Sequence, residues 1–172
     1  MSRREWLKNV IDTQGFTKGV ELGVLKGPTF KYLIGNCPNL HLTGIDVFFP
    51  DRRWKAQKIS TNEELLKTEP VSWYDTLIEF CLPYGPRANI MRSFTVEAAA
   101  SFEDDSLDFV FIDADHSYEG VKQDIKHWLP KVKKGGLVSG HDLHMLEVRQ
   151  AVMEFNMNFQ EGPDNVWYWI KE

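Results

Sequence analysis

Carboxylate and imidazole side chains stand directly after two short apolar runs of the sequence. Asp113 and His116 follow the first of these runs, and His141 and Asp142 follow the second. A histidine whose pKa is near neutrality can act as a general base towards a hydroxyl group. A divalent metal held by carboxylates can instead lower the pKa of that hydroxyl. These residue types therefore favour chemistry on a hydroxyl nucleophile, through His116 and His141 or through Asp113 and Asp142.

A turn with two glycines lies nearer the start of the chain and indicates a ligand that approaches the backbone closely. Gly23 and Gly27 do not have the G-x-G-x-x-G spacing of a dinucleotide-binding turn, and the carboxylate of Glu21 suits a ligand with a cationic part. Asp46 follows the first glycine by about twenty residues, the usual distance for an acid that binds ribose hydroxyls. A tight surface turn and an acidic loop residue are the structural alternatives.

The hydrophobic pattern predicts the elements that must position these side chains. Helical periodicity predicts helices over residues 3–11, 28–34, 62–82 (one helix, or two broken near Pro70), 96–102 (with Thr95 as N-cap), 118–132 and 146–155. Residues 133–136 are predicted as the basic, glycine-terminated end of the fifth helix. Short apolar runs predict strands over residues 17–24, 40–46, 89–92, 107–112, 137–139 and 166–170. The alternation of strands and helices is typical of an α/β fold with a largely parallel sheet.

Ligands of such sheets bind beyond the carboxyl ends of the strands. We therefore expect one edge of the sheet to collect the glycine turn, Asp46, residues 92–95 and the acid and imidazole groups named above. Residues 48–60 are predicted as a loop, in which Arg52, Arg53 and Trp54 either cover the ligand or form a solvated surface.

Composition narrows the class of protein. The chain has 172 residues, which predicts a single domain over residues 1–172. With 20 basic and 25 acidic side chains, its formal charge is −5, so no nucleic-acid partner is expected. No apolar run approaches the ~20 residues needed to span a bilayer, and the charged N-terminus does not resemble a secretory signal. We expect a cytoplasmic protein with two reduced cysteines and no membrane partner; the oligomeric state stays open, a homodimer included.

Two motifs resemble a known family. Residues 20–27, Val-Glu-Leu-Gly-Val-Leu-Lys-Gly, resemble motif I of class I S-adenosylmethionine-dependent methyltransferases. The more specific stretch from Asp108 to Ile125, followed by Gly135-Gly136 and Gly140-His141-Asp142, resembles a small methyltransferase family with the signature IDADHSYEGV…GG…GHD. That family is similar to the catechol, caffeoyl-CoA and macrolide-sugar O-methyltransferases. The resemblance extends from about residue 18 to residue 170 and so covers nearly the whole chain.

The resemblance implies a fold and a set of cofactor contacts. The fold is a Rossmann-like sheet of seven strands, mostly parallel, with helices on both faces and the last strand antiparallel. The implied contacts with S-adenosylmethionine are Glu21, Gly23 and Gly27 at the methionine part, Asp46 at the ribose, Ser93, Phe94 and Thr95 at the adenine, and Asp113 beside the reactive end. Phe94 stands where the family usually has an acid, so an aromatic side chain could stack on the adenine there.

The resemblance also bears on metal dependence and activity. Metal-dependent relatives hold a divalent cation such as Mg²⁺ with acids that match Asp113 and Asp142, but Leu143 takes the place of their asparagine. His116 and His141 could complete a site for a softer metal, so metal dependence stays open. The implied function is O-methylation of a small-molecule or sugar hydroxyl, with His141, His116 and Asp113 as catalytic residues. The alternative is a module that binds S-adenosylmethionine without catalysis of its own.

Overall fold

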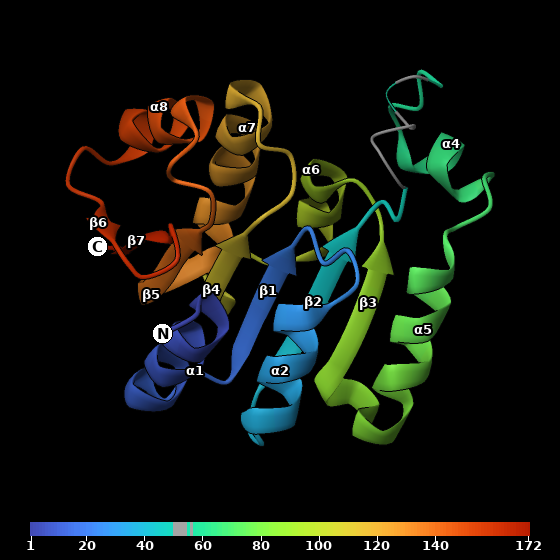
Figure 1. Cartoon of the computed structure of the whole chain (residues 1–172), viewed down its shortest axis with the longest axis horizontal. Helices are drawn as coiled ribbons and strands as arrows, with labels where there is room; N and C mark the ends of the chain where they lie inside the picture. Colours follow the sequence, from blue (N-terminus) through green and yellow to red (C-terminus); the bar gives the residue numbers. More distant parts are fainter. Residues whose placement is uncertain (50–54, 56) are drawn as a thin grey trace.

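A seven-stranded sheet forms the centre of the protein (Figure 1). The structure is a computed structural model and describes residues 1–49, 55 and 57–172; the predicted loop residues Arg52, Arg53 and Trp54 lie outside them. Within the described residues the strands are β1 (Lys18–Leu22), β2 (His41–Asp46), β3 (Ala88–Arg92), β4 (Leu107–Ile112), β5 (Val132–Gly140), β6 (Gln160–Glu161) and β7 (Trp167–Ile170). Their order across the sheet is β3-β2-β1-β4-β5-β7-β6. The first five pair in parallel, and β7 runs antiparallel to both of its neighbours, which confirms the predicted sheet.

Helices cover both faces of the sheet, as predicted (Figure 1). Their bounds are α1 (Arg3–Gln14), α2 (Pro28–Asn36), α4 (Asn62–Leu66), α5 (Ser72–Cys81), α6 (Thr95–Ala98), α7 (Tyr118–Trp128) and α8 (Leu146–Phe155). Short 3₁₀ turns occur at η2 (Leu82–Arg87), η3 (Ala99–Ser101) and η4 (Leu129–Lys131). None of the helices in the described part of the chain has the length and apolar character that a membrane crossing needs.

Alternate residues of the central strands build two hydrophobic cores. In β4, Phe109 and Phe111 pack with α1, α2 and α5, whereas Val110 and Ile112 pack with α6, α7 and α8. Successive side chains of a strand point to opposite faces, so a strand covered on both sides is apolar throughout. The near-continuous apolar run over residues 107–112 is therefore explained by burial on both faces, and this burial fixes the carboxyl end of β4 in the middle of the sheet.

Three local predictions were wrong. Helix α6 begins at Thr95 with Phe94 as its N-cap, and the Thr95 hydroxyl instead bonds to Asp124. The predicted helix over residues 118–132 ends at Trp128, because Pro130 cannot continue the backbone hydrogen bonding. Residues 133–136 belong to β5 rather than to a helix end, and Gly135 takes a positive φ of 78° where the pairing of β4 with β5 shifts register.

The predicted helix over residues 62–82 has the break expected near Pro70, since α4 and α5 are separate helices. The short edge strand β6 was not predicted.

Candidate active site

The strand ends are held side by side by backbone hydrogen bonds that continue past the strands. The first residue after each of β1, β3, β4 and β5 donates its N–H to a neighbouring strand, with N···O distances of 2.8–3.1 Å. These residues are Gly23, Ser93, Asp113 and His141. The predicted site residues therefore lie along one edge of the sheet, in the order in which the strands pair.

The glycine turn fits closely against the end of β4. Gly23 has a φ of +83°, and a Cβ atom there would lie 2.1 Å from the carbonyl oxygen of Asp113. Gly27 has a φ of +75°, and its Cβ atom would lie 2.5 Å from the Leu77 side chain. Any side chain at Gly23 would displace backbone, so both conformation and space require glycine there.

Asp46 holds this turn to β2. Its carboxylate accepts hydrogen bonds from the backbone N–H of Leu25 at 2.8 Å and of Phe48 at 2.6 Å. Burial raises the pKa of Asp46, while the backbone donors act in the opposite direction. A carboxylate has about four acceptor positions, so hydroxyl donors can still bind beside the two amides.

Glu21 is a buried carboxyl group within the same turn region. Its side chain is only 3% exposed, and among the described residues Oε2 has no hydrogen-bond partner. Burial raises the pKa of Glu21 well above its ordinary value, and the negative charge of Asp113 raises it further. Because an unpartnered buried oxygen is costly, a donor from a bound ligand would stabilise it.

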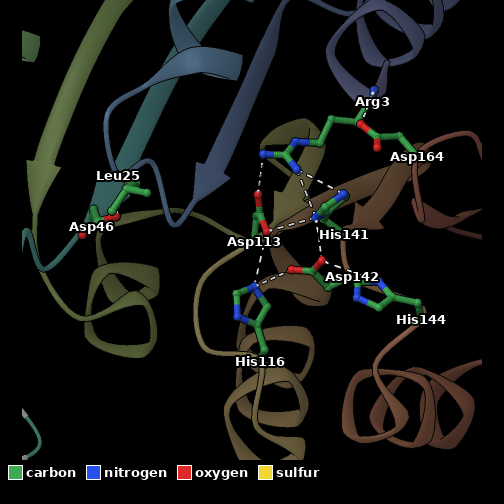
Figure 2. Close-up of polar contacts among 9 residues, drawn as sticks. All are labelled: Arg3, Leu25, Asp46, Asp113, His116, His141, Asp142, His144 and Asp164. Carbon is green, nitrogen blue, oxygen red and sulfur yellow. Dashed lines mark hydrogen bonds and ion pairs between the residues drawn. The ribbon is translucent and has the colours of Figure 1, made fainter. Parts of the chain in front are cut away.

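Two histidines and two aspartates meet beyond β4 and β5 (Figure 2). The Asp142 carboxylate lies 2.8 Å from His116 Nε2 and 3.1 Å from His141 Nδ1. Asp113 Oδ1 lies 3.5 Å from each of the same two nitrogens. His144, which is more exposed, approaches Asp142 to 3.7 Å. The four groups predicted from the two apolar runs thus form one cluster.

The environment shifts the pKa values of two of these groups in opposite directions. Burial by itself would raise the pKa of Asp113, but hydrogen bonds from His116 and His141, with the charge of Arg3, lower it overall. Burial by itself would lower the pKa of His141, but Asp113 raises it overall. Asp113 is therefore ionised at neutral pH, and His141 holds a proton more readily than a free imidazole.

Arg3 is a member of this cluster that sequence reasoning missed. Its side chain reaches from the start of α1, with Nη2 3.3 Å from Asp113 and Nη1 3.1 Å from each ring nitrogen of His141 (Figure 2). The backbone N–H of Arg3 donates to Asp164 at 3.1 Å. More than a hundred residues separate Arg3 from the cluster in sequence, so no local motif could have indicated the contact.

The residues predicted at the adenine lie at the end of β3. Ser93 Oγ and the Phe94 N–H both bond to the side chain of Asn62 at 2.8 Å. Thr95 Oγ1 lies 2.5 Å from the buried carboxyl of Asp124. Asn62, on α4, was not predicted as a site residue, because its contact again depends on distant segments.

The donor set fits a divalent cation. One ligand atom from each of Asp113, His141 and Asp142 lies within 4.8 Å of the other two. Two carboxylates with one imidazole suit several divalent metals. Leu143, which replaces the asparagine of the metal-dependent relatives, is buried in the core beside α8 and offers no ligand.

Solved structures of low sequence identity share the fold. A candidate caffeoyl-CoA O-methyltransferase of Staphylococcus aureus has a TM-score of 0.64 at 18% identity and covers 98% of this chain, which spans 82% of that protein. An O-methyltransferase of Bacillus cereus, solved with S-adenosylhomocysteine (SAH), has a TM-score of 0.65 at 12% identity; it covers 98% of this chain, which spans 80% of that one.

Sequence comparison assigns the family. The uncharacterised protein y4gI of Sinorhizobium fredii is 33% identical over 96 residues, covering 49% of this chain. The chain spans only 10% of the length of that curated relative. A family model described as a methyltransferase domain matches residues 20–143, which include the glycine turn and the whole acid and imidazole cluster. The motifs thus identified the family correctly: this chain belongs to the methyltransferase domain family.

Proposed function

We propose that this protein transfers a methyl group from S-adenosylmethionine to a hydroxyl group of a small molecule or sugar. One observation carries the proposal: a glycine turn, a ribose-type acid and a cluster of two acids and two histidines occupy one continuous sheet edge. O-methyltransferases with the same fold, one of them solved with SAH, support it.

The cofactor is expected along this edge. The turn from Glu21 to Gly27 would hold its methionine part, where the unpartnered carboxyl of Glu21 can accept a hydrogen bond from an ammonium group. Asp46 would accept hydrogen bonds from the ribose hydroxyls. Ser93, Phe94 and Thr95 would border the adenine, with Asn62 fixing the backbone of Phe94.

The acid and imidazole cluster would serve the methyl acceptor. In an in-line displacement, the acceptor oxygen forms a bond to the methyl carbon while the carbon–sulfur bond breaks and its electron pair stays on sulfur. His141 or His116 would accept the hydroxyl proton, and Asp113 and Asp142 would stabilise the imidazolium that results. A divalent cation bound by Asp113, His141 and Asp142 would supply Lewis acidity towards the hydroxyl.

Calorimetry with SAH tests the cofactor assignment. Wild-type protein should bind SAH, and Asp46→Ala should weaken binding on the order of tenfold or more, because it removes hydrogen bonds to a charged acceptor. Asp104→Ala is the control, since Asp104 is an exposed acid whose ion pair with Lys131 lies away from the site. Absence of heat and of a thermal shift at millimolar SAH would contradict the proposal.

Transfer from labelled S-adenosylmethionine to a panel of hydroxyl acceptors tests catalysis. Asp142→Asn should reduce transfer strongly while SAH still binds. SAH binding combined with no transfer to any acceptor would favour a cofactor-binding module without catalysis.

A further inference from the structure

The candidate cation site already contains a positive charge supplied by the chain itself. Of the three groups that could hold a divalent ion, Asp113 and His141 both contact the Arg3 guanidinium. Asp142, the third, contacts the two histidines. The side chain of Arg3 is about one quarter exposed, so this contact is partly screened from water rather than fully solvated.

The guanidinium approaches the groups that a metal would need. Nη2 lies 3.3 Å from Asp113 Oδ2. Nη1 lies 3.1 Å from both Nδ1 and Nε2 of His141. The guanidinium therefore contacts both ring nitrogens and does not form a hydrogen bond with one of them alone. A divalent cation bound to Asp113 and His141 would therefore lie within a few ångströms of a fixed unit charge, where the repulsion is strong.

Arg3 is held in this position by the fold. Helix α1 starts with a capping box between Ser2 and Glu5, and the Arg3 N–H donates to Asp164. Trp6 and Leu7, one turn further along, are buried in the core. The fold thus keeps the guanidinium close to Asp113.

A further carboxyl group lies near this position. Glu21, nearly fully buried, leaves Oε2 without a partner in the described part of the chain, and both Asp113 and Arg3 influence its ionisation. Asp113 and Asp142 together favour a cation, and the structure offers Arg3 for that role.

We propose that Arg3 is a built-in cation that competes with divalent metal ions for Asp113 and His141. Metal binding then requires the guanidinium to leave, and the wild-type protein binds metal weakly. The inference rests on the cation site of the proposed function, and not on the identity of the methyl donor.

Binding of Mn²⁺, followed by electron paramagnetic resonance of the free ion and by calorimetry, tests the competition. Arg3→Gln should bind Mn²⁺ on the order of tenfold or more tightly than wild type. Arg3→Lys keeps the charge and should stay close to wild type. The matched control is Arg4→Gln, because Arg4 is the next residue of α1 and lies over the Tyr32 ring instead. Adding Asp142→Asn to Arg3→Gln should remove the gain.

Equal Mn²⁺ affinity in wild type and Arg3→Gln would overturn the proposal, as would no detectable binding in Arg3→Gln. An equal gain in Arg3→Lys would also overturn it, since the effect would then not arise from charge. Circular dichroism and SAH binding of the same samples separate this result from the proposed function: SAH affinity that is retained while Mn²⁺ affinity does not change contradicts only the role of Arg3.

Discussion

The pKa values of two carboxyl groups of the site, Glu21 and Asp113, are shifted in opposite directions because their surroundings differ. Glu21 is buried with an unpartnered oxygen, so burial raises its pKa, whereas His116, His141 and Arg3 outweigh burial and lower the pKa of Asp113. Neighbouring acids whose pKa values are shifted in opposite directions can take different roles at one pH. Here Glu21 Oε2, which has no partner among the described residues, suits a hydrogen-bond donor of a ligand, and the ionised Asp113 suits a cation.

A third acid, Asp124, is expected to make the stability of the protein depend on pH. It is buried in α7 against Thr95, and burial raises its pKa from 3.8 to about 7. A raised pKa in the folded state means that the stabilisation is complete below about pH 4 and is lost as the pH rises through about 7. At 1.36 kcal/mol per pH unit, the loss is at most about 4 kcal/mol.

We therefore predict that Asp124→Asn flattens the pH dependence of stability. The amide oxygen can still accept the hydrogen bond from the Thr95 hydroxyl, and the amide does not ionise. As the pH rises from 5 to 8, the free energy of unfolding of the variant should increase relative to that of wild type. Urea titration at both pH values measures this difference. Asp104→Asn, at an exposed acid, serves as control. Parallel pH curves for wild type and Asp124→Asn would show that Asp124 does not titrate in this range.

At the scale of elements, β7 supports the turn that carries His141 and Asp142. The Trp167 indole N–H donates to the carbonyl of His141 at 3.1 Å. A Cβ atom at Gly140 would lie 2.3 Å from the same indole ring, so the strand end and the ring are in direct contact. The antiparallel strand thus fixes the backbone from which His141 and Asp142 project.

Trp167→Phe should consequently destabilise the protein and impair the site. The change leaves a partly buried carbonyl without its donor and a void beside Gly140, together worth about 2–4 kcal/mol of unfolding free energy. Trp169→Phe is the comparison, since Trp169 lies on the same strand and stacks on Trp167 at a centroid distance of 5.6 Å. Urea unfolding measures stability, and labelled-methyl transfer measures activity. If both variants lose the same amounts, the hydrogen bond to His141 has no special role.

The elements that could be predicted are those whose signals are local. Burial on both faces made residues 107–112 a recognisable strand, and the position directly after it identified Asp113. The strand segment over 133–136 was missed because lysines and glycines give it no apolar pattern, and its backbone hydrogen bonds are made with Lys171, which is distant in sequence. Arg3 and Asn62 were missed because their contacts join segments far apart in sequence. Hydrophobic periodicity gives no information on such contacts.

At the scale of the whole molecule, the sheet connects two cores that would otherwise be separate. One contains Trp6, and the other contains Trp128 and Trp167. Strands β2, β4 and β5 contribute to both, so loss of packing on one face removes support from the other. We infer that residues 1–172 unfold as a single cooperative unit, as the length of the chain predicts.

Coincident unfolding curves would demonstrate this cooperativity, and SAH should shift them together. Wild type and Trp6→Phe are unfolded in urea and followed by tryptophan fluorescence and by far-ultraviolet circular dichroism. Each probe should show one transition in each protein. Within each protein the two midpoints should agree.

Because the proposed cofactor site includes the ends of β1, β2, β3 and β4, SAH at a hundred times its dissociation constant should add about 2.7 kcal/mol to the unfolding free energy reported by both probes. Asp46→Ala should lose most of this gain. A transition that splits in the presence of SAH, with only one probe shifted, would mean that the cofactor stabilises a part of the fold and that the two cores unfold independently.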